Sequence, residues 1–361
     1  MMENKTVLLG MSGGVDSSVS AYLLQKQGYK VIGAFMKNFS ENKNPLTGEC
    51  NWVEEKKMAQ KLCSILKIPL ITIDSEKEYL KYVIKPMLKA YKEGKTPNPD
   101  TLCNKIIKFP ILWKKAKQIK ADYIATGHYA RIKSKNGKFH LLAGKDKSKD
   151  QYYFLYDLSQ SDLSHTLFQI GNYTKEQVRK IAKENNFPNW NKKGTSGVCF
   201  IGTIDFKAYL KNKIKTKEGK ILNEKGITIG SHPGSQYFTI GERIGERKGV
   251  IINKEHKVNK KLYVTEKIKN SLVIVSESNP RLKKSKIIIK KFHLINPKAK
   301  IPKSLKARIR HLGSLNPGIL KSSNNIYSFT FNKPVKALAE GQAIVLYNKD
   351  EVIGGGEISY N

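Results

Sequence analysis

The chain has 361 residues, 39% of them hydrophobic, and its 66 lysines and arginines outnumber its 30 aspartates and glutamates, for a net charge of +36. This length allows two or three domains, and no apolar run approaches the roughly 18 residues that span a membrane. The first residues, MMENKT, show neither a signal peptide nor an organelle presequence, so we expect a cytoplasmic protein without a membrane partner. The charge favours a polyanionic partner, because phosphate contacts release counterions. The alternative is a lysine-rich bias that only solvates the surface.

Strands and helices are predicted to alternate over the first 125 residues or so. Apolar segments at 6–12, 30–38, 69–75 and 122–128 are typical of buried strands, and helices are predicted at 17–28, 53–67 and 105–119. Short buried strands separated by amphipathic helices indicate a parallel sheet with right-handed crossovers. Ligands of such sheets bind beyond the carboxyl ends of the strands. We therefore expect a nucleotide to meet the segments GMSGG, FMKN and ATGHYAR.

The segment SGGVDS, residues 12–17, lies between the first strand and the first helix. Adjacent glycines let backbone N–H groups turn toward an anion, and the helix adds its positive N-terminus. Because no Gly-Lys-Ser/Thr follows, the loop is not the usual ATP-hydrolysing P-loop. It matches the modified P-loop of enzymes that split ATP into AMP and pyrophosphate. Ser12, Ser17 and backbone amides are expected to hold pyrophosphate, and Asp16 to help place Mg²⁺; a plain tight turn is the alternative.

Two of the four cysteines are candidates for sulfur chemistry. Cys103 lies in TPNPDTLCNKIIKF near Lys105 and Lys108, and nearby cations stabilise the reactive thiolate. Asn98-Pro99-Asp100 is predicted to form a rigid turn before it. Cys199 follows a lysine-containing turn in NKKGTSGVCFIG, although a small hydrophobe at a strand end would fit the same pattern.

The other two cysteines have no predicted chemical role. Cys63 fits the apolar face of a helix, and Cys50 has no clear function. No CxxC pair suggests a metal site. Two lysine-flanked thiols, an ATP-splitting loop and a large positive charge together favour sulfur delivery to an adenylated base in RNA.

The second half of the chain is predicted to be rich in β-structure. Glycine-rich apolar segments after about residue 205 indicate a small β-rich domain, and short strands with Gly, Pro and Asn turns from about residue 280 indicate a small β-barrel. We therefore predict an α/β domain over residues 1–205, a small central domain over 206–279 and a C-terminal β-barrel over 280–361.

The chain closely resembles the bacterial tRNA-specific 2-thiouridylases, which place sulfur on C2 of the wobble uridine of certain tRNAs. The resemblance covers essentially the whole length through GMSGGVDSS, TPNPDTLCNKIIKF, ATGHYAR, KDQYYFL, SGVCFIG, YFTIGER, GQAIVLY and GGGEI, in family order. It implies an adenine-nucleotide α-hydrolase-like catalytic domain with a parallel sheet and modified P-loop, a central domain, and a C-terminal β-barrel that contacts tRNA.

The resemblance also implies residue roles. Cys103 is the catalytic nucleophile, Cys199 carries the persulfide, and Asp100 is a candidate general acid or base. Asn98, Pro99 and Asp100 surround the target base. The residues implied to bind the nucleotide are Gly10, Met11, Ser12, Gly13, Gly14, Val15, Asp16, Ser17, Met36 and Gly127. Those implied to touch tRNA are His128, Lys149, Asp150, Gln151, Arg310, His311 and Gln342.

The implied reaction is ATP-dependent adenylation of the uridine 34 oxygen at C2, followed by sulfur transfer from the Cys199 persulfide with loss of AMP. Either the persulfide attacks C2 directly or Cys103 first releases sulfide, and both routes leave a Cys103–Cys199 disulfide. The implied partners are wobble-uridine tRNAs such as those for Glu, Gln and Lys, and a sulfur donor such as a cysteine desulfurase or relay protein. The chain departs from the family pattern at Gly194-Thr195, Tyr152, Thr203 and His311.

Two alternatives remain open. A sister enzyme, which forms 4-thiouridine or lysidine or is an amidotransferase synthetase, would share SGGVDS but would not need NPDTLCN together with SGVCFIG. A basic RNA-binding protein with a retired nucleotide fold would explain the charge but gives no reason to keep both cysteines.

Overall fold

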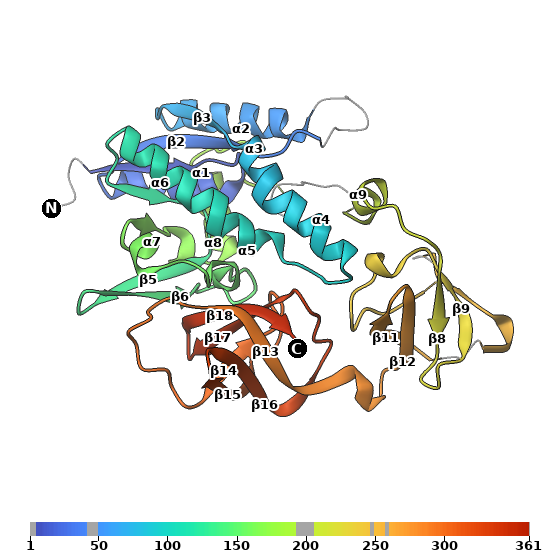
Figure 1. Ribbon diagram of the computed structural model, residues 1–361. Helices are drawn as coiled ribbons and strands as arrows, with labels where there is room; N and C mark the ends of the chain where they lie inside the picture. The colour runs from blue at the N-terminus through green and yellow to red at the C-terminus, as the bar shows by residue number, and fades with distance from the viewer. Residues whose placement is uncertain (1–4, 42–49, 193–205, 246–248, 257–259, 361) are drawn as a thin grey trace.

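The computed structural model describes residues 5–41, 50–192, 206–245, 249–256 and 260–360. An α/β part, a small β part and a β-barrel follow one another along the chain (Figure 1). In the described residues, no helix is both long and apolar enough to cross a membrane.

The N-terminal part is built on a parallel sheet in the order β3-β2-β1-β4-β7, as the alternating pattern predicts. Its strands are β1 (Thr6–Gly10), β2 (Lys30–Lys37), β3 (Leu70–Asp74), β4 (Tyr123–Ala125) and β7 (Thr166–Leu167). The order reverses at β1, between β2 and β4. The carboxyl ends of these three strands therefore form the crevice in which such sheets bind ligands.

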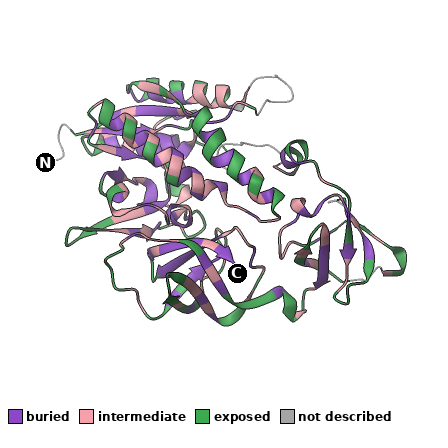
Figure 2. Cartoon of the chain, in the orientation of Figure 1, coloured by how far each residue is buried: buried purple, intermediate pink, exposed green. Residues whose placement is uncertain are grey.

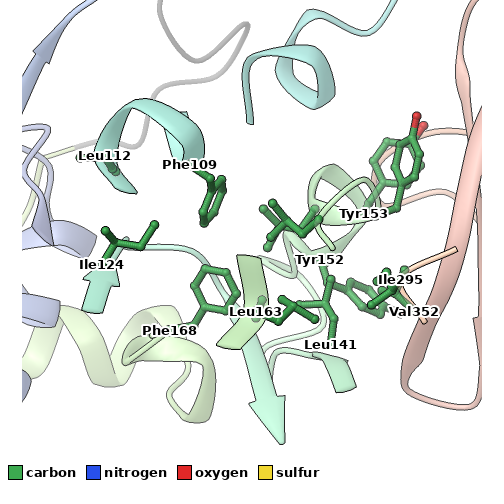
Figure 3. Packing of buried hydrophobic residues seen from close by; sticks show 14 of the residues in the cluster. Phe109, Leu112, Ile124, Leu141, Tyr152, Tyr153, Leu163, Phe168, Ile295 and Val352 are labelled. Atoms are coloured by element: carbon green, nitrogen blue, oxygen red, sulfur yellow. The ribbon is translucent and has the colours of Figure 1, made fainter. Parts of the chain in front are cut away.

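Helices cover both faces of this sheet. The apolar sides of α1 (Val15–Lys26), α2 (Asn51–Ile65) and α8 (Lys175–Glu184) share one buried cluster. The opposite face packs against α6 (Phe109–Gln118) in a second cluster, which continues through Tyr152 and Tyr153 to the barrel (Figure 3). Colouring by burial shows exposed and less exposed residues alternating along α2 and α6, which lie in front of the sheet or above it in this view (Figure 2).

The segment around Cys103 begins a helix, and the predicted rigid turn at Asn98-Pro99-Asp100 is wrong. The Asn98 side chain accepts a hydrogen bond from the Thr101 amide at 3.4 Å, and Pro99 occupies the first helical turn, where its missing N–H costs nothing. Helical structure then continues through α5 (Pro99–Cys103), a π-helical turn (Asn104–Lys108) and α6. A preceding helical segment, not predicted, comprises α3 (Glu76–Tyr79), a π-helical turn (Leu80–Ile84) and α4 (Lys85–Lys92).

The hairpin of β5 (Ala130–Lys135) and β6 (Lys138–Ala143) was also not predicted, and it joins the sheet of the C-terminal barrel. The connection runs through Leu142 of β6, which pairs with Glu351 of β18. The α/β part therefore contributes two strands to a sheet that belongs to the other end of the chain. The short helix α7 (Gln160–Ser164) follows.

The β-rich second half is confirmed. After α9 (Phe206–Lys213), the central part forms a sheet in the order β10-β9-β8-β12-β11. Its strands are β8 (Gly219–Leu222), β9 (Thr228–His232), β10 (Ile251–Ile252), β11 (Leu262–Ile268) and β12 (Ser271–Ser276). In the barrel, pairing of β13 with β18 closes a ring of strands. These are β13 (Lys283–Leu294), β14 (Leu305–Arg308), β15 (Asn316–Ser323), β16 (Ile326–Lys336), β17 (Ala343–Asn348) and β18 (Glu351–Ser359).

Candidate nucleotide pocket and thiol site

A cavity of about 230 Å³ opens where the ends of β1, β2 and β4 meet, as the topology predicts. Of the ten residues implied to bind the nucleotide, all but Gly13 line it: Gly10, Met11, Ser12, Gly14, Val15, Asp16, Ser17, Met36 and Gly127. Gly127 allows the end of β4 to approach α1, since a Cβ there would lie 2.9 Å from the backbone of Asp16 and Ser17. Strand ends and the start of α1 thus form one wall of a pocket large enough for part of a nucleotide.

The glycine loop is held in shape by its own serines and by a distant asparagine. The Ser12 and Ser17 hydroxyls lie 3.3 Å apart, and Ser17 Oγ donates to the Gly14 carbonyl at 3.0 Å. Asn189, which is buried, donates from Nδ2 to the Gly13 carbonyl at 3.1 Å. Gly13 has φ +70°, and a Cβ there would lie 2.5 Å from the Glu55 carbonyl oxygen. The loop is therefore fixed before any ligand arrives.

Asp16 is engaged by protein groups. Both its carboxylate oxygens accept hydrogen bonds from Lys175 Nζ, at 2.7 and 2.8 Å, and Tyr129 donates its hydroxyl to Oδ1 at 2.8 Å. Within the described ranges, no group of three or more His, Cys, Asp and Glu side chains could hold a metal ion. Mg²⁺ in nucleotide sites takes only one or two carboxylates beside the phosphates, so the role of Asp16 in placing Mg²⁺ stays a prediction.

His128 also lines the pocket, directly after Gly127. Its Nδ1 is 2.7 Å from Thr126 Oγ1, its Nε2 is 3.5 Å from Lys108 Nζ, and its ring stacks on Phe109. Burial, together with the Lys108 cation, holds the pKa of His128 well below its usual range, so the ring is neutral at pH 7. Its position fits the nucleotide pocket directly, whereas a contact with tRNA stays a prediction.

Cys103 lies in the interior, with its side chain 1% exposed. It belongs to a buried cluster formed by the 76–92 helices, α9 and the helix that carries Cys103 itself, including Tyr79, Met87 and Tyr209. The adjacent Lys105 is on the surface and pairs with Asp157 at 2.8 Å, so its charge is partly balanced there. Cys199 lies outside the described residues, so its predicted pairing with Cys103 stays a prediction.

The other two cysteines match their expected characters. Cys63 is a core residue, 2% exposed, and burial raises the pKa of its thiol to about 11. Cys50 precedes α2 and donates its thiol to the Ser40 carbonyl at 3.0 Å.

The segment 144–152 connects the pocket with the barrel. Gln151 lines the pocket, and its Oε1 accepts from the Tyr129 amide at 3.1 Å. The neighbouring Asp150 has no exposed surface and pairs with Arg308 of β14 at 3.3 Å. Burial raises the pKa of Asp150 to about 6 even though Arg308 and two backbone amides favour its charged form. The Asp150 carboxylate faces Arg308 in the interior, and a contact of Asp150 with tRNA stays a prediction.

The barrel approaches the Cys103 helix through His311. Its Nε2 lies 2.8 Å from the Asp150 carbonyl oxygen, and its ring lies against Phe154. Burial lowers the pKa of His311, and the nearby Asp100 carboxylate acts in the opposite direction. Asp100 and His311, far apart in sequence, therefore lie within electrostatic range of each other.

The remaining residues implied to touch tRNA lie on or near the surface. Lys149 and Arg310 are exposed. Gln342 is partly exposed, in a loop that is tied to the chain ahead of Asn98 by a hydrogen bond from the Thr96 amide to the Glu340 carbonyl. Tyr152, at a family departure, is buried against Tyr347 and below the Arg308 guanidinium.

Thr126, and Tyr129 beside the loop, lie in the segment ATGHYAR that the sequence predicts to meet the nucleotide. Lys108 was noted only for its proximity to Cys103, yet it lines the nucleotide pocket. Other residues at the pocket or the loop were missed from the sequence, and no local pattern marks them: Glu55, Lys175, Lys192 and Asn189. Only the packing of α2, α8 and the segment after it against the loop brings them there.

Family profiles match three successive segments of the chain. A "tRNA methyl transferase HUP domain" profile matches residues 5–203, a "tRNA methyl transferase PRC-barrel domain" profile matches 207–277, and an "Aminomethyltransferase beta-barrel domain" profile matches 284–358.

Two relatives are similar over nearly the full length. The tRNA-specific 2-thiouridylase MnmA 1 of Geobacillus kaustophilus is 40% identical over 99% of this chain and 96% of its own. The tRNA-specific 2-thiouridylase MnmA of Francisella tularensis subsp. novicida is 39% identical over 99% of this chain and 100% of its own. A solved 4-thiouridine synthetase, bound to RNA and ATP, shares 16% identity over 55% of this chain and 45% of its own, with a TM-score of 0.35, too distant to indicate a function.

Proposed function

The chain belongs to the tRNA-specific 2-thiouridylase family, and on that basis we propose which of its residues carry each step of the reaction. It is a tRNA sulfurtransferase that forms 2-thiouridine in tRNA. One arrangement carries this assignment of steps. A pocket lies at the glycine loop, and a helical segment, here called the thiol helix, runs from Asn98 past Cys103 to the same pocket.

In the first step, ATP occupies the pocket with its polyphosphate at the Ser12–Ser17 loop. The uridine 34 oxygen at C2 attacks the α-phosphorus, the bond to the β-phosphate oxygen breaks, and pyrophosphate leaves. The backbone amides of the loop and the N-terminus of α1 favour the charge of the departing group. Asp16, whose carboxylate accepts hydrogen bonds from Lys175, would help place a Mg²⁺ that enters with the nucleotide.

In the second step, sulfur replaces the activated oxygen. The terminal sulfur of a Cys199 persulfide attacks C2 and AMP departs; Cys103 then attacks the Cys199 sulfur, which frees the thiocarbonyl and leaves a disulfide. Alternatively, Cys103 attacks first and releases sulfide, which attacks C2. An external reductant restores both thiols. We assign to Asp100, which acts electrostatically on His311, the exchange of a proton with the base.

In this proposal the anticodon arm of the tRNA, which carries uridine 34, enters between the thiol helix and the barrel. Asn98, Pro99 and Asp100 surround uridine 34, which must leave its stack to reach the pocket. Lys149, Gln151, Arg310, His311 and Gln342 contact the RNA. Wobble-uridine tRNAs for Glu, Gln and Lys are the expected substrates, and a cysteine desulfurase or relay protein supplies the sulfur.

The test is to incubate the purified protein with ATP, a persulfide donor and unmodified tRNA, and to locate thiolated nucleosides by digestion and mass spectrometry. We expect sulfur at position 34, lost in Cys103→Ser and in Cys199→Ser but retained in the control Cys50→Ser. Sulfur at another position would show that a different nucleotide of the tRNA is the target. Tight tRNA binding without sulfur transfer or AMP release would reject the assigned steps.

A further inference from the structure

The glycine loop lacks the lysine that other phosphate-binding loops provide, yet the polyphosphate of ATP needs cationic partners. Three lysines line the pocket, and none comes from the loop: Lys108, Lys175 and Lys192. They come from two different parts of the chain. Lys108 ends the π-helical turn after Cys103, whereas Lys175 begins α8 and Lys192 follows it.

Lys175 and Lys192 stand at the glycine-loop end. Lys175 Nζ bonds both oxygens of Asp16, the second residue of α1, and has only 15% of its side chain exposed. Lys192 acts electrostatically on Glu55, whose backbone carbonyl faces Gly13. Lys175 is therefore paired with a carboxylate, and Lys192 lies within electrostatic range of one; Asp16 and Glu55 both line the pocket.

Lys108 reaches the pocket from a different part of the fold. It directly precedes α6, which packs on the other face of the sheet from α1 and α8. Its Nζ is 3.5 Å from the neutral ring of His128, which follows Gly127 at the end of β4. Lys108 is also the pocket lysine on the helical segment that carries Cys103, five residues earlier. The thiol must meet the same atom, C2, whose oxygen attacks the α-phosphorus. We therefore expect the α-phosphate to react on the side of the pocket that this helical segment supplies.

These positions match two different chemical needs. During attack at the α-phosphorus, charge spreads over the α-phosphate oxygens, and a fixed cation there acts mainly on the transition state. The β- and γ-phosphates carry their charge before, during and after the reaction, so cations at that end stabilise bound ATP and bound pyrophosphate alike.

We propose that Lys108 is a catalytic residue that binds the α-phosphate as uridine attacks it, whereas Lys175 and Lys192 bind the β- and γ-phosphates that leave as pyrophosphate. This division rests on the proposed adenylation of uridine. It deepens that function by assigning the lysines from the two faces of the sheet to different phosphates.

The test compares Lys108→Met with Lys175→Met, with Lys114→Met as the matched control, because Lys114 is an exposed lysine on the next helix, α6. Steady-state AMP release is measured with tRNA, and the affinity for inorganic pyrophosphate is measured directly. For Lys108→Met we expect a fall in kcat of about 100- to 1000-fold, as for loss of one transition-state donor, with less than about threefold change in KM for ATP and in pyrophosphate affinity. Lys108→Arg should recover part of kcat.

For Lys175→Met we expect the opposite split, a roughly tenfold weaker pyrophosphate affinity and a raised KM for ATP. Unchanged kcat in Lys108→Met, or weakened pyrophosphate binding equal to that of Lys175→Met, would overturn the division. Unchanged thermal unfolding and tRNA affinity identify each variant as folded. The pyrophosphate measurement needs no thiolation, so it still tests the division if the wild-type protein adenylates no uridine, the result by which the proposed function itself would fail.

Discussion

The nucleotide pocket and the thiol site are prepared to different degrees. The glycine loop is fixed by Ser12, Ser17 and Asn189, and its pocket is open to a ligand. Cys103, one helix away, is enclosed by a cluster to which α9 contributes Tyr209 and Leu210. The difference indicates an order of events: ATP can bind to the chain as it stands, whereas sulfur chemistry requires that side chains around Cys103 move. A thiol kept from solvent until then is protected from oxidation.

The largest expected effect comes from distorting the glycine loop of the nucleotide pocket. Gly13→Ala adds a Cβ 2.5 Å from a carbonyl oxygen at a φ of +70°, so the loop must shift. We expect a loss of about 100-fold in AMP release, the order of magnitude for a misplacement near 1 Å. Gly28→Ala is the matched control, because Gly28 also has a positive φ but no atom within 4 Å, and should cost only about 1 kcal/mol of stability. Equal losses in both variants would contradict a preformed loop.

The covered state of Cys103 can be measured by alkylation of the tRNA-free protein, followed by mass spectrometry. Partly exposed Cys50 should react at least about tenfold faster than Cys103, since reaction needs an accessible thiolate. Tyr209→Ala should speed the reaction of Cys103 and leave Cys63, in a separate cluster, unchanged. Alkylation of Cys103 as fast as that of Cys50 would remove the contrast between the two sites.

The stability that the Asp150–Arg308 contact gives to the folded protein should depend on pH. Asp150 has a pKa of about 6 in the folded protein, above its value of 3.8 when unfolded, so the folded state binds the proton more tightly. Its contribution to stability is present below about pH 4 and is lost as the pH rises through 6. In urea unfolding, Asp150→Asn should lessen the loss of stability between pH 5 and 7 by an amount on the order of 1 kcal/mol. Asp350→Asn, an exposed ion-pair residue, should behave as the wild type.

The smallest effects are expected on the RNA-facing surface. Lys149→Ala and Arg310→Ala remove exposed cations, so each should weaken tRNA binding a few-fold and reduce the salt dependence by about one phosphate contact. Neither should change ATP affinity, which the pocket residues determine. A change in the KM for ATP as large as that for tRNA would show that the surface and the pocket are not separable.

The sheet, the glycine loop and the barrel could be predicted because their signals are local: strand periodicity, SGGVDS and short strands between turns. The surroundings of the loop could not, because Asn189 and Lys175 reach it from more than 150 positions away. The rigid turn at Asn98 was wrong since an Asn-Pro pair marks a helix start as readily as a turn. The pairing of buried Asp150 with Arg308 could not be predicted either, because only the folded barrel supplies that partner.

The pairing of β6 with β18 limits how this protein can be divided by truncation. A fragment that ends near residue 205 would retain every residue of the glycine loop, yet β6 would become an open sheet edge and Asp150 would lose its cation. Open edges recruit other chains, and an uncompensated buried charge opposes folding by about 3–5 kcal/mol. Such a fragment should therefore aggregate during expression. A circularly permuted chain preserves both contacts and should not aggregate.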